Sequence, residues 1–455
     1  MSSGNGAAMR ETENHFDVVV VGGGIAGLQS ALDLADQDYR VLVVEKQPSI
    51  GGRMISLSKV FPTLDCASCI TTPKMSAAAH HSNITLMTYT TVDAIEPAGD
   101  NHRLTLTQMA RYVDTSACIG CRQCEYVCPV EYPDPFEQGM GALRAISVPF
   151  ANAIPQYAVL NPEYCIGCGA CVRACASDAI RLDQQPKTLT VEAGAVVLAT
   201  GFHLNSTSLK PQYNASRSKD IVSPLQVERL LAPHGPYGRV LRPSDGKIPD
   251  SVAFVLCAGS RDQSIGVPYC SRVCCMYSIK QAMLLSGALP TADITIYYMD
   301  IRAFGKGFEQ FYQNAKAMGI SFVKGKVARI TPQPNGDLMA RVEAIEEDGR
   351  VMENRHDLVV LAQGIVPELV SPERLGAAKE EDGFIRRPDP LRPAWTGREG
   401  IFVAGTAAGP KDIVDSIMEA GSAAMEASHY LTQKRATADA NAPSLELEVI
   451  GAASE

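Results

Sequence analysis

Two cysteine runs in the second quarter of this 455-residue chain constrain its fold more than any other feature. Each run has three cysteines at intervals of three positions and a fourth cysteine four positions later. Three closely spaced thiolates can hold one face of an iron–sulfur cube, while the fourth points toward a second cube. The spacing therefore predicts two four-iron clusters with crossed ligands, Cys118, Cys121, Cys124 and Cys175 on one and Cys165, Cys168, Cys171 and Cys128 on the other.

A zinc ribbon is the alternative for closely spaced cysteines. It uses two pairs of ligands per site rather than a triplet plus a remote fourth, so two complete, matching runs favour a two-cluster bacterial ferredoxin module. One difference separates the runs, because Pro129 follows Cys128 whereas Ala176 follows Cys175. A proline removes an amide donor near the sulfur, so its absence is expected to alter the potential of one cluster without removing a ligand.

The composition indicates a redox protein of a reducing compartment. The 14 cysteines are organised in motifs, and the sequence shows no signal-peptide apolar segment. No apolar run reaches the roughly 18 residues needed to cross a bilayer, so we expect a cytoplasmic protein with no membrane span. The net charge of -9 argues against a nucleic-acid partner, because phosphate binding needs clustered cations.

The N-terminal part of the chain predicts a dinucleotide-binding turn. An apolar strand, 16–21, leads into Gly22-x-Gly24-x-x-Gly27, which opens a helix. Gly22 permits a tight turn, Gly24 lets the backbone approach a pyrophosphate, and Gly27 allows close packing of helix and strand. A second apolar strand ends at Glu45, which is placed to hydrogen-bond an adenosine ribose.

Three further segments favour FAD over NAD as the occupant. Residues 51–54 resemble the second glycine pair of two-dinucleotide-domain flavoproteins, the strand 195–199 resembles their return strand, and residues 400–405 resemble their closing FAD motif. The FAD domain is therefore assembled from separated stretches. The predicted FAD contacts are Gly22, Gly24, Ala26, Gly27, Glu45, Lys46, Gly52, Arg53, Met54, Thr200, Gly201, Gly405, Lys411, Asp412 and Ile413.

The sequence thus predicts an α/β fold, a two-dinucleotide-binding-domain flavoprotein of the thioredoxin-reductase-like, Rossmann type, with an inserted two-cluster α+β ferredoxin domain. An insertion is tethered at both ends, which fixes the distance between clusters and flavin. The predicted parts are a disordered lead (1–14), a discontinuous FAD domain (15–107, 191–248 and 366–435), the ferredoxin domain (108–190), a second Rossmann-like domain (249–365) and a flexible tail (436–455).

The second Rossmann-like domain is expected to differ from the nicotinamide domain of disulfide-reductase-type flavoproteins. The turn after its first strand, 252–256, lacks the G-x-G-x-x-G/A pattern, so a nicotinamide site is doubtful. The domain instead carries four cysteines. They fit three readings, namely buried packing residues, a redox disulfide, or a third cluster held by Cys257, Cys270, Cys274 and Cys275.

The chain resembles the flavin-carrying A subunit of heterodisulfide reductase. The resemblance implies that the four cysteines bind a third four-iron cluster beside the flavin. It also implies that Lys280 and Lys411 approach the flavin, where a lysine would stabilise the anionic form; a solvated surface lysine is the alternative. The matching segments are 22–27, Asp65-Cys66-Ala67-Ser68-Cys69 with Ile70 to Met75, the inserted ferredoxin, Cys257 to Asp262, Tyr269-Cys270, Cys274-Cys275 and Gly409 to Ile413.

Larger family members carry an additional N-terminal domain and a C-terminal ferredoxin, so we expect a short form. The pair Cys66 and Cys69 stays open as a redox dithiol, half of a metal site shared with another chain, or two buried thiols.

The resemblance implies an oxidoreductase that passes electrons between FAD and clusters, with partners like the B and C subunits of heterodisulfide reductase and disulfide or sulfur substrates. Flavin-based bifurcation is one activity that the resemblance allows, and a free ferredoxin and a second copy of the chain are further candidate partners. Two alternatives remain, a self-contained NAD(P)H-dependent reductase with a fused ferredoxin and a non-catalytic electron relay.

Overall fold

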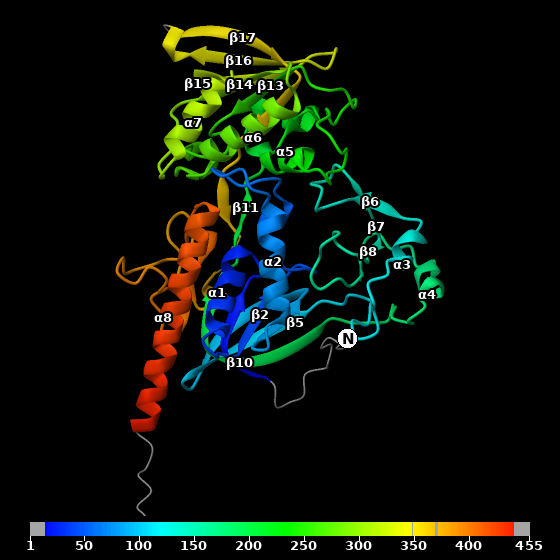
Figure 1. Cartoon of the computed structure of the whole chain (residues 1–455), viewed down its shortest axis with the longest axis vertical. Helices are drawn as coiled ribbons and strands as arrows, with labels where there is room; N and C mark the ends of the chain where they lie inside the picture. The colour runs from blue at the N-terminus through cyan, green and yellow to red at the C-terminus, as the bar shows by residue number, and fades with distance from the viewer. Residues whose placement is uncertain (1–13, 348, 369–371, 441–455) are drawn as a thin grey trace, which may run out of the picture.

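The computed structural model describes residues 14–347, 349–368 and 372–440, which form three units (Figure 1). The first unit lies in the centre of the view, the second at the top, and an inserted segment at the right. Strands β11 (Phe202–Leu204) and β19 (Ile365–Pro367) pair in antiparallel fashion between the first two units.

The first unit is a sheet with strand order β3-β2-β1-β10-β5-β4, to which β20 adds by pairing with the second half of β10. The strands around β1 are parallel, whereas β5 and β4 are antiparallel to their neighbours. Near-continuous burial of β1 and β2 is typical of a sheet covered on both faces. The bounds are β1 His15–Val21, β2 Val41–Glu45, β3 Ile84–Thr88, β4 Thr90–Ala98, β5 Asn101–Gln108, β10 Lys187–Leu198 and β20 Ile401–Val403.

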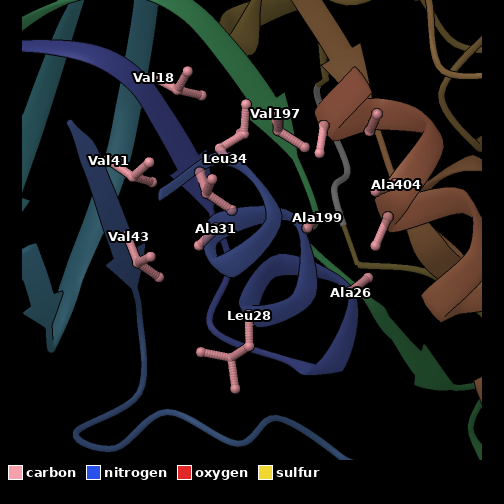
Figure 2. Close-up of a cluster of buried hydrophobic side chains, with 14 of the residues drawn as sticks. Val18, Ala26, Leu28, Ala31, Leu34, Val41, Val43, Val197, Ala199 and Ala404 are labelled. Atoms are coloured by element: carbon pink, nitrogen blue, oxygen red, sulfur yellow. The ribbon is translucent and has the colours of Figure 1, made fainter. Parts of the chain in front are cut away.

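Helices α1 (Ile25–Ala35), α2 (Ala67–His80) and α8 (Ile413–Ala440) belong to this unit. Figure 2 shows Ala31 and Leu34 of α1 lying among Val41, Val43 and Val197 of the strands, and all five are fully buried. Helices α1 and α8 are in direct contact, since Ser30 Oγ of α1 donates to Ala420 O of α8 at 3.1 Å. No helix in the described part of the chain is long and apolar enough to cross a membrane.

The second unit has strand order β12-β18-β13-β14-β15-β16-β17. Its first five strands are parallel and its last pairs antiparallel. The bounds are β12 Ile221–Val222, β13 Ser251–Val255, β14 Asp293–Tyr298, β15 Ser321–Pro332, β16 Leu338–Ala344, β17 Arg350–His356, β18 Leu358–Leu361, α5 Pro224–Leu231, α6 Cys274–Ala288 and α7 Phe308–Ala317.

The inserted segment occupies residues 109–186, between β5 and β10. Its two ends adjoin Gln108 and Lys187, which are register partners in the sheet. It also docks on the first unit, because Ile50 N donates to Ile154 O (2.9 Å) and Ile154 N donates to Ser49 Oγ (2.9 Å). Its elements are α3 Gln123–Tyr126, β6 Glu131–Pro133, β7 Ala142–Arg144, β8 Ile146–Ser147, β9 Val159–Leu160 and α4 Ala170–Ala174.

The structure differs from the predicted division of the chain at two places. Strand β12 pairs with β18 and α5 packs on α6, so the segment from about residue 221 belongs with the second unit rather than with the first. The predicted tail begins as helix, since residues 436–440 continue α8. The rest of that tail and residues 1–13 of the predicted lead lie outside the described residues.

Candidate redox site

The first group of thiols in the insert combines three cysteines of one run with one of the other. Cys118, Cys121 and the remote Cys175 lie close enough to Cys124 to act on its charge. Burial and these neighbouring thiols raise the pKa of Cys124 to about 12. The four residues predicted for the first cluster are therefore neighbours.

The second group lines one hollow at the surface of the insert, formed by Cys128, Cys165, Cys168 and Cys171. Burial raises the pKa of Cys171, and Cys165 and Cys128 add to the shift. The remote cysteine of each run thus lies with the triplet of the other run, which is the arrangement that crossed ligation requires.

These eight thiols are free, and the chemistry of the donor set fits iron. A buried thiol among other thiols stays protonated at neutral pH unless a cation compensates the thiolate, and iron supplies that charge. In the part of the chain that is described, no three His, Cys, Asp or Glu side chains converge closely enough to hold a single metal ion.

The two cysteine loops curl through left-handed residues. Gly120, Gly167 and Gly169 have φ angles of 69°, 70° and 68°, which glycine adopts without steric cost. Arg122 takes the equivalent position of Gly169 with a φ of 62°, and its guanidinium donates to both Glu125 oxygens at 2.9 and 2.7 Å. A local ion pair thus accompanies the conformation that glycine supplies in the other loop.

The two remote cysteines have different surroundings. Ala179 N donates to Cys175 Sγ at 3.3 Å. Although burial acts to raise it, donors from Ala179 and Ser177 hold the pKa of Cys175 below its ordinary value. The Cys128 thiol instead donates to Val130 O at 3.7 Å. The expected difference in cluster potential stays a prediction, and these donors give it a physical basis.

The predicted dinucleotide turn is a close-packed cradle. A Cβ on Gly22 would lie 2.3 Å from Ala199 O, and one on Gly27 would lie 1.9 Å from Gly22 O. Gly24 is more open, since its nearest neighbour is the Gly52 Cα at 3.8 Å. The first and second glycine motifs therefore face each other, and the backbone at Gly24 is left free to approach a phosphate.

Glu45 and Thr200 lie at the edges of this cradle. Glu45 is buried and accepts hydrogen bonds from Gly23 N and Gln47 N, both at 2.7 Å. Burial raises the pKa of Glu45, and these amides oppose the shift. The buried Thr200 Oγ1 has no hydrogen-bond partner, so a bound group would satisfy it. These observations fit a dinucleotide, while contact of Glu45 with a ribose stays a prediction.

The other predicted FAD residues gather around the same turn. A Cβ on Gly405 would lie 2.7 Å from Ala26 Cβ, which brings the closing motif to the start of α1. Lys411 is buried, and its Nζ donates to Gly405 O (2.8 Å) and to Glu419. Asp412 Oδ1 accepts from Asp415 N (2.8 Å) beside Ile413, the first residue of α8. The remaining residues are Lys46, paired with Glu368, the exposed Arg53, the buried Met54, and Gly201 with a φ of 81°.

The second unit brings its four cysteines together at the start of α6. Burial raises the pKa of Cys275 to about 11, and Cys257 and Cys270 add to the shift. Burial, Cys275, Cys257 and Cys270 raise the pKa of Cys274 as well. All four are free thiols. Their donor set suits a third cluster, which stays a prediction.

Two residues beside this group had no role assigned from sequence. Arg261 hydrogen-bonds the Cys257 side chain and donates from Nη1 to Asp300 Oδ1 at 2.6 Å. Tyr277 lies against Cys274 and donates to Gln363 O at 3.1 Å. Arg261 lies in the segment from Cys257 to Asp262, which is part of the family resemblance. Its place in that segment was the only indication in the sequence that it belongs to the site.

The turn after β13, where a nicotinamide phosphate would bind in a second Rossmann unit, is filled by protein. A Cβ on Gly259 would lie 2.2 Å from Asn205 Oδ1, and one on Gly364 would lie 2.2 Å from Gly259 O. Asn205 bridges the two, since Gly364 N donates to its Oδ1 at 3.0 Å. Here the glycines permit packing rather than approach of a phosphate.

The structure places Lys280 within the second unit. Its ammonium pairs with Glu228 of α5, and both side chains are buried. Glu228 also accepts from Ser58 N (3.0 Å) and Ser58 Oγ (2.7 Å), in the loop that follows the second glycine motif. The flavin contact predicted for Lys280 is not tested, and its buried carboxylate partner was missed by the sequence.

Comparison with known proteins gives close relatives. The chain is 43% identical, over 90% of its length, to the A subunit of the H(2):CoB-CoM heterodisulfide,ferredoxin reductase of Methanothermobacter thermautotrophicus. It covers 63% of that relative, somewhat less than two thirds. Two iron-sulfur A subunits of CoB--CoM heterodisulfide reductase from Methanopyrus kandleri are each 41% identical. They match 95% and 97% of this chain and are covered over 67% and 68% of their own lengths.

Two family models match parts of the chain, an NAD(P)-binding Rossmann-like domain at residues 20–72 and a 4Fe-4S dicluster domain at residues 117–180. Among solved structures, the thioredoxin reductases of Lactococcus lactis and T. acidophilum superpose with TM-scores of 0.52 at 14% identity. They match 92% and 93% of this chain and 99% and 100% of their own. The fold is a thioredoxin-reductase-like pair of Rossmann units with an inserted dicluster domain, so the predicted fold class is confirmed.

Proposed function

This chain belongs to the family of heterodisulfide reductase A subunits, and from that membership we propose that it is the FAD and iron–sulfur electron-transfer component of an oxidoreductase complex. It exchanges electron pairs at FAD and single electrons through two ferredoxin-type four-iron clusters. A third cluster on Cys257, Cys270, Cys274 and Cys275 completes the set. The crossed grouping of the eight insert cysteines is the observation that carries the proposal.

When bound, FAD transfers two electrons together and each cluster carries one at a time. The residues of the chain fix where this happens. Gly24 and Gly52 would offer bare backbone to the phosphates, and Lys411 holds the closing turn against α8. The docking of Ile154 on Ser49 and Ile50 sets the insert at one place on the first unit. Fixed spacing suits electron transfer, which depends on the distance between centres.

We propose partners like the B and C subunits of heterodisulfide reductase, with a disulfide or sulfur compound as terminal substrate, in the cytoplasm. The named relatives are A subunits of heterodisulfide reductases, and one name includes ferredoxin. Bifurcation requires two exit routes of different potential. The insert clusters and the third cluster lie in different units and would supply such routes. A free ferredoxin or a second copy of the chain would be the further partners.

A self-contained NAD(P)H-dependent reductase is the second candidate, because residues 20–72 match an NAD(P)-binding description. That match covers the turn assigned here to FAD. Bleaching of the flavin by stoichiometric NADH or NADPH without oxygen would favour the second candidate. An unchanged flavin spectrum would favour the role in a complex.

Iron and acid-labile sulfide per FAD in anaerobically purified protein test the proposal. We expect about twelve irons and about twelve sulfides, which correspond to three four-iron clusters. About eight irons would rule out the third cluster and leave Cys257, Cys270, Cys274 and Cys275 as thiols or a disulfide. Protein without FAD, or with no cluster in the insert, would contradict the proposal.

Paired serine variants test the crossed ligation. Cys128→Ser with Cys165→Ser removes two ligands of one cluster, so we expect a loss of about four irons. Cys128→Ser with Cys118→Ser removes one ligand from each cluster, so we expect a loss of up to about eight. If each run held its own cluster, the two results would be exchanged. Iron analysis and electron paramagnetic resonance of the reduced proteins give the readout.

A further inference from the structure

Cys66 and Cys69 are the two cysteines that none of the three groups uses, and they are joined by a disulfide with a Cα–Cα distance of 5.2 Å. The pair lies at the start of α2, where Cys66 precedes the first helical residue. Cys66 is partly buried, whereas Cys69 is exposed. One sulfur of the bond is therefore open to an attacking thiol.

The surroundings of Cys66 favour its role as leaving group. Its Sγ accepts a hydrogen bond from Cys69 N at 3.2 Å. An amide donor at the start of a helix stabilises a thiolate, and a stabilised thiolate leaves a disulfide faster. The two sulfurs thus differ in the two properties that direct thiol–disulfide exchange, access and leaving-group stability.

A metal site is the alternative use of such a pair. A zinc ion takes four protein ligands when its role is structural, and Cys66 and Cys69 supply two. Among the described residues, no third His, Cys, Asp or Glu joins them in a group that could hold a metal ion. The other twelve cysteines lie in their own groups of four.

The disulfide lies at the base of a hairpin that reaches the second unit. Cys66 pairs with Lys59 across this hairpin. At its tip, Phe61 is partly buried and packs against the core of the second unit, with its ring centroid 5.7 Å from that of Phe308. Ala67 N donates to Ser58 O at 3.3 Å, and Ser58 bonds Glu228. The pair is thus attached directly to the junction between the first and second units.

We propose that Cys66 and Cys69 are a redox-active pair that exchanges two electrons with an external dithiol or its disulfide. In the reducing direction, the thiolate of the dithiol attacks Cys69 Sγ. The Cys66–Cys69 bond breaks, a mixed disulfide forms, and the electron pair leaves on Cys66 Sγ. The second thiol of the dithiol loses its proton and attacks its own mixed-disulfide sulfur, which releases Cys69. Two electrons and two protons then reside on the pair, and the external dithiol has become a disulfide.

The test uses the full chain, purified without oxygen with its cofactors, in buffers of reduced and oxidised dithiothreitol. After an acid quench and alkylation, mass spectrometry of the peptide that contains both cysteines counts the labels. We expect none at the oxidising end, two at the reducing end, and a midpoint inside the range. Thr63→Ala, a change at an exposed position of the same hairpin that keeps both cysteines, should leave the midpoint unchanged.

Single serine variants test the assigned roles with glutathione disulfide as the probe. Cys66→Ser leaves the exposed Cys69, which should form a glutathione adduct about tenfold faster than Cys66 does in Cys69→Ser, since access limits the reaction. A pair that keeps one state across the whole range would overturn the proposal. So would a loss of about four irons in either variant, which would identify the pair as cluster ligands. The labels are counted independently of flavin or cluster function, so the proposed function can fail separately.

Discussion

At the scale of single residues, the buried ion pair between Lys280 and Glu228 joins the second unit to Ser58 of the first. Breaking a buried pair on one side leaves the other charge without compensation, which costs about 3–5 kcal/mol. We expect Lys280→Met to lower the free energy of unfolding by about this amount. Adding Glu228→Gln removes the uncompensated charge, so the double variant should regain most of the lost free energy of unfolding. Urea unfolding of the three proteins measures both effects.

The same two variants test the flavin role predicted for Lys280. If its ammonium acts on the flavin, both variants should shift the flavin midpoint potential in a redox titration, with cluster content unchanged. A shift in Lys280→Met that disappears in the double variant would assign the effect to the stranded carboxylate. Unchanged midpoints in both proteins would count against the flavin role.

His356 should make the stability of the second unit depend on pH. It is buried between Tyr297 OH (2.8 Å) and Ser251 Oγ (2.9 Å), and burial lowers its pKa to about 4. The unfolded chain takes up this proton near pH 6.5, before the folded chain does. The contribution of neutral His356 to the free energy of unfolding is therefore fully present above about pH 6.5, and it is lost as the pH falls toward 4.

Lowering the pH from 7.5 to 5 should reduce the free energy of unfolding of the native chain. In His356→Gln, which cannot titrate, we expect this reduction to be smaller by about 1–3 kcal/mol. Urea unfolding at the two pH values measures the difference, and equal losses in both proteins would contradict it.

Sequence patterns located single residues only where a motif fixes the spacing. The cysteines and glycines were found because metal and phosphate chemistry dictates their intervals. Glu228 and Asn205 were missed, since each acts on a residue more than fifty positions away. Such pairings depend on the tertiary fold and leave no local pattern.

At the scale of elements, the glycines of the dinucleotide turn have two different roles, one in packing and one in cofactor contact. A Cβ on Gly24 has room in the protein, whereas one on Gly27 would overlap Gly22 O. We expect Gly24→Ala to change the free energy of unfolding of the FAD-free protein by about 0.5 kcal/mol or less, but to weaken FAD binding at least about tenfold, because the methyl group meets the pyrophosphate.

Gly27→Ala should destabilise the FAD-free protein itself. Thermal unfolding and FAD titration of the two variants compare these effects. Normal FAD affinity in Gly24→Ala would place the phosphates elsewhere.

The elements were easier to predict than their grouping. The apolar strand predicted at 16–21 is β1, His15–Val21, and the strand predicted at 252–256 is β13, Ser251–Val255. Buried parallel strands have long apolar runs that periodicity detects. The two-residue strand β12 is too short for such a signal, which is why the boundary near residue 221 was misplaced.

At the scale of the whole molecule, Arg229 of α5 contacts all three units. Its guanidinium donates to both Glu137 oxygens of the insert (2.9 and 2.8 Å) and to Ser56 O of the first unit (3.1 Å). It also lies over the Phe136 ring, 4.5 Å from the centroid. One side chain thus fixes the insert against both Rossmann units.

We expect Arg229→Met to destabilise the protein by about 3–5 kcal/mol, because it strands Glu137 in a largely buried position. Hydrogen exchange of residues 134–141 should become faster, with cluster content unchanged. Arg103→Gln breaks an exposed ion pair with Glu192 and should change stability by about 0.5 kcal/mol or less. Equal hydrogen exchange in Arg229→Met and the native chain would show that the other docking contacts hold the insert in place without Arg229.

Gln108 and Lys187 are paired in the sheet, so the whole insert lies between two neighbouring strands of the first unit. The segment that holds eight cysteines is synthesised before β10, the central strand of the flavin-binding sheet. The closing strand β20 and helix α8 follow more than two hundred residues later. Because chain segments fold as they emerge, iron–sulfur assembly on the nascent insert can precede capture of the flavin.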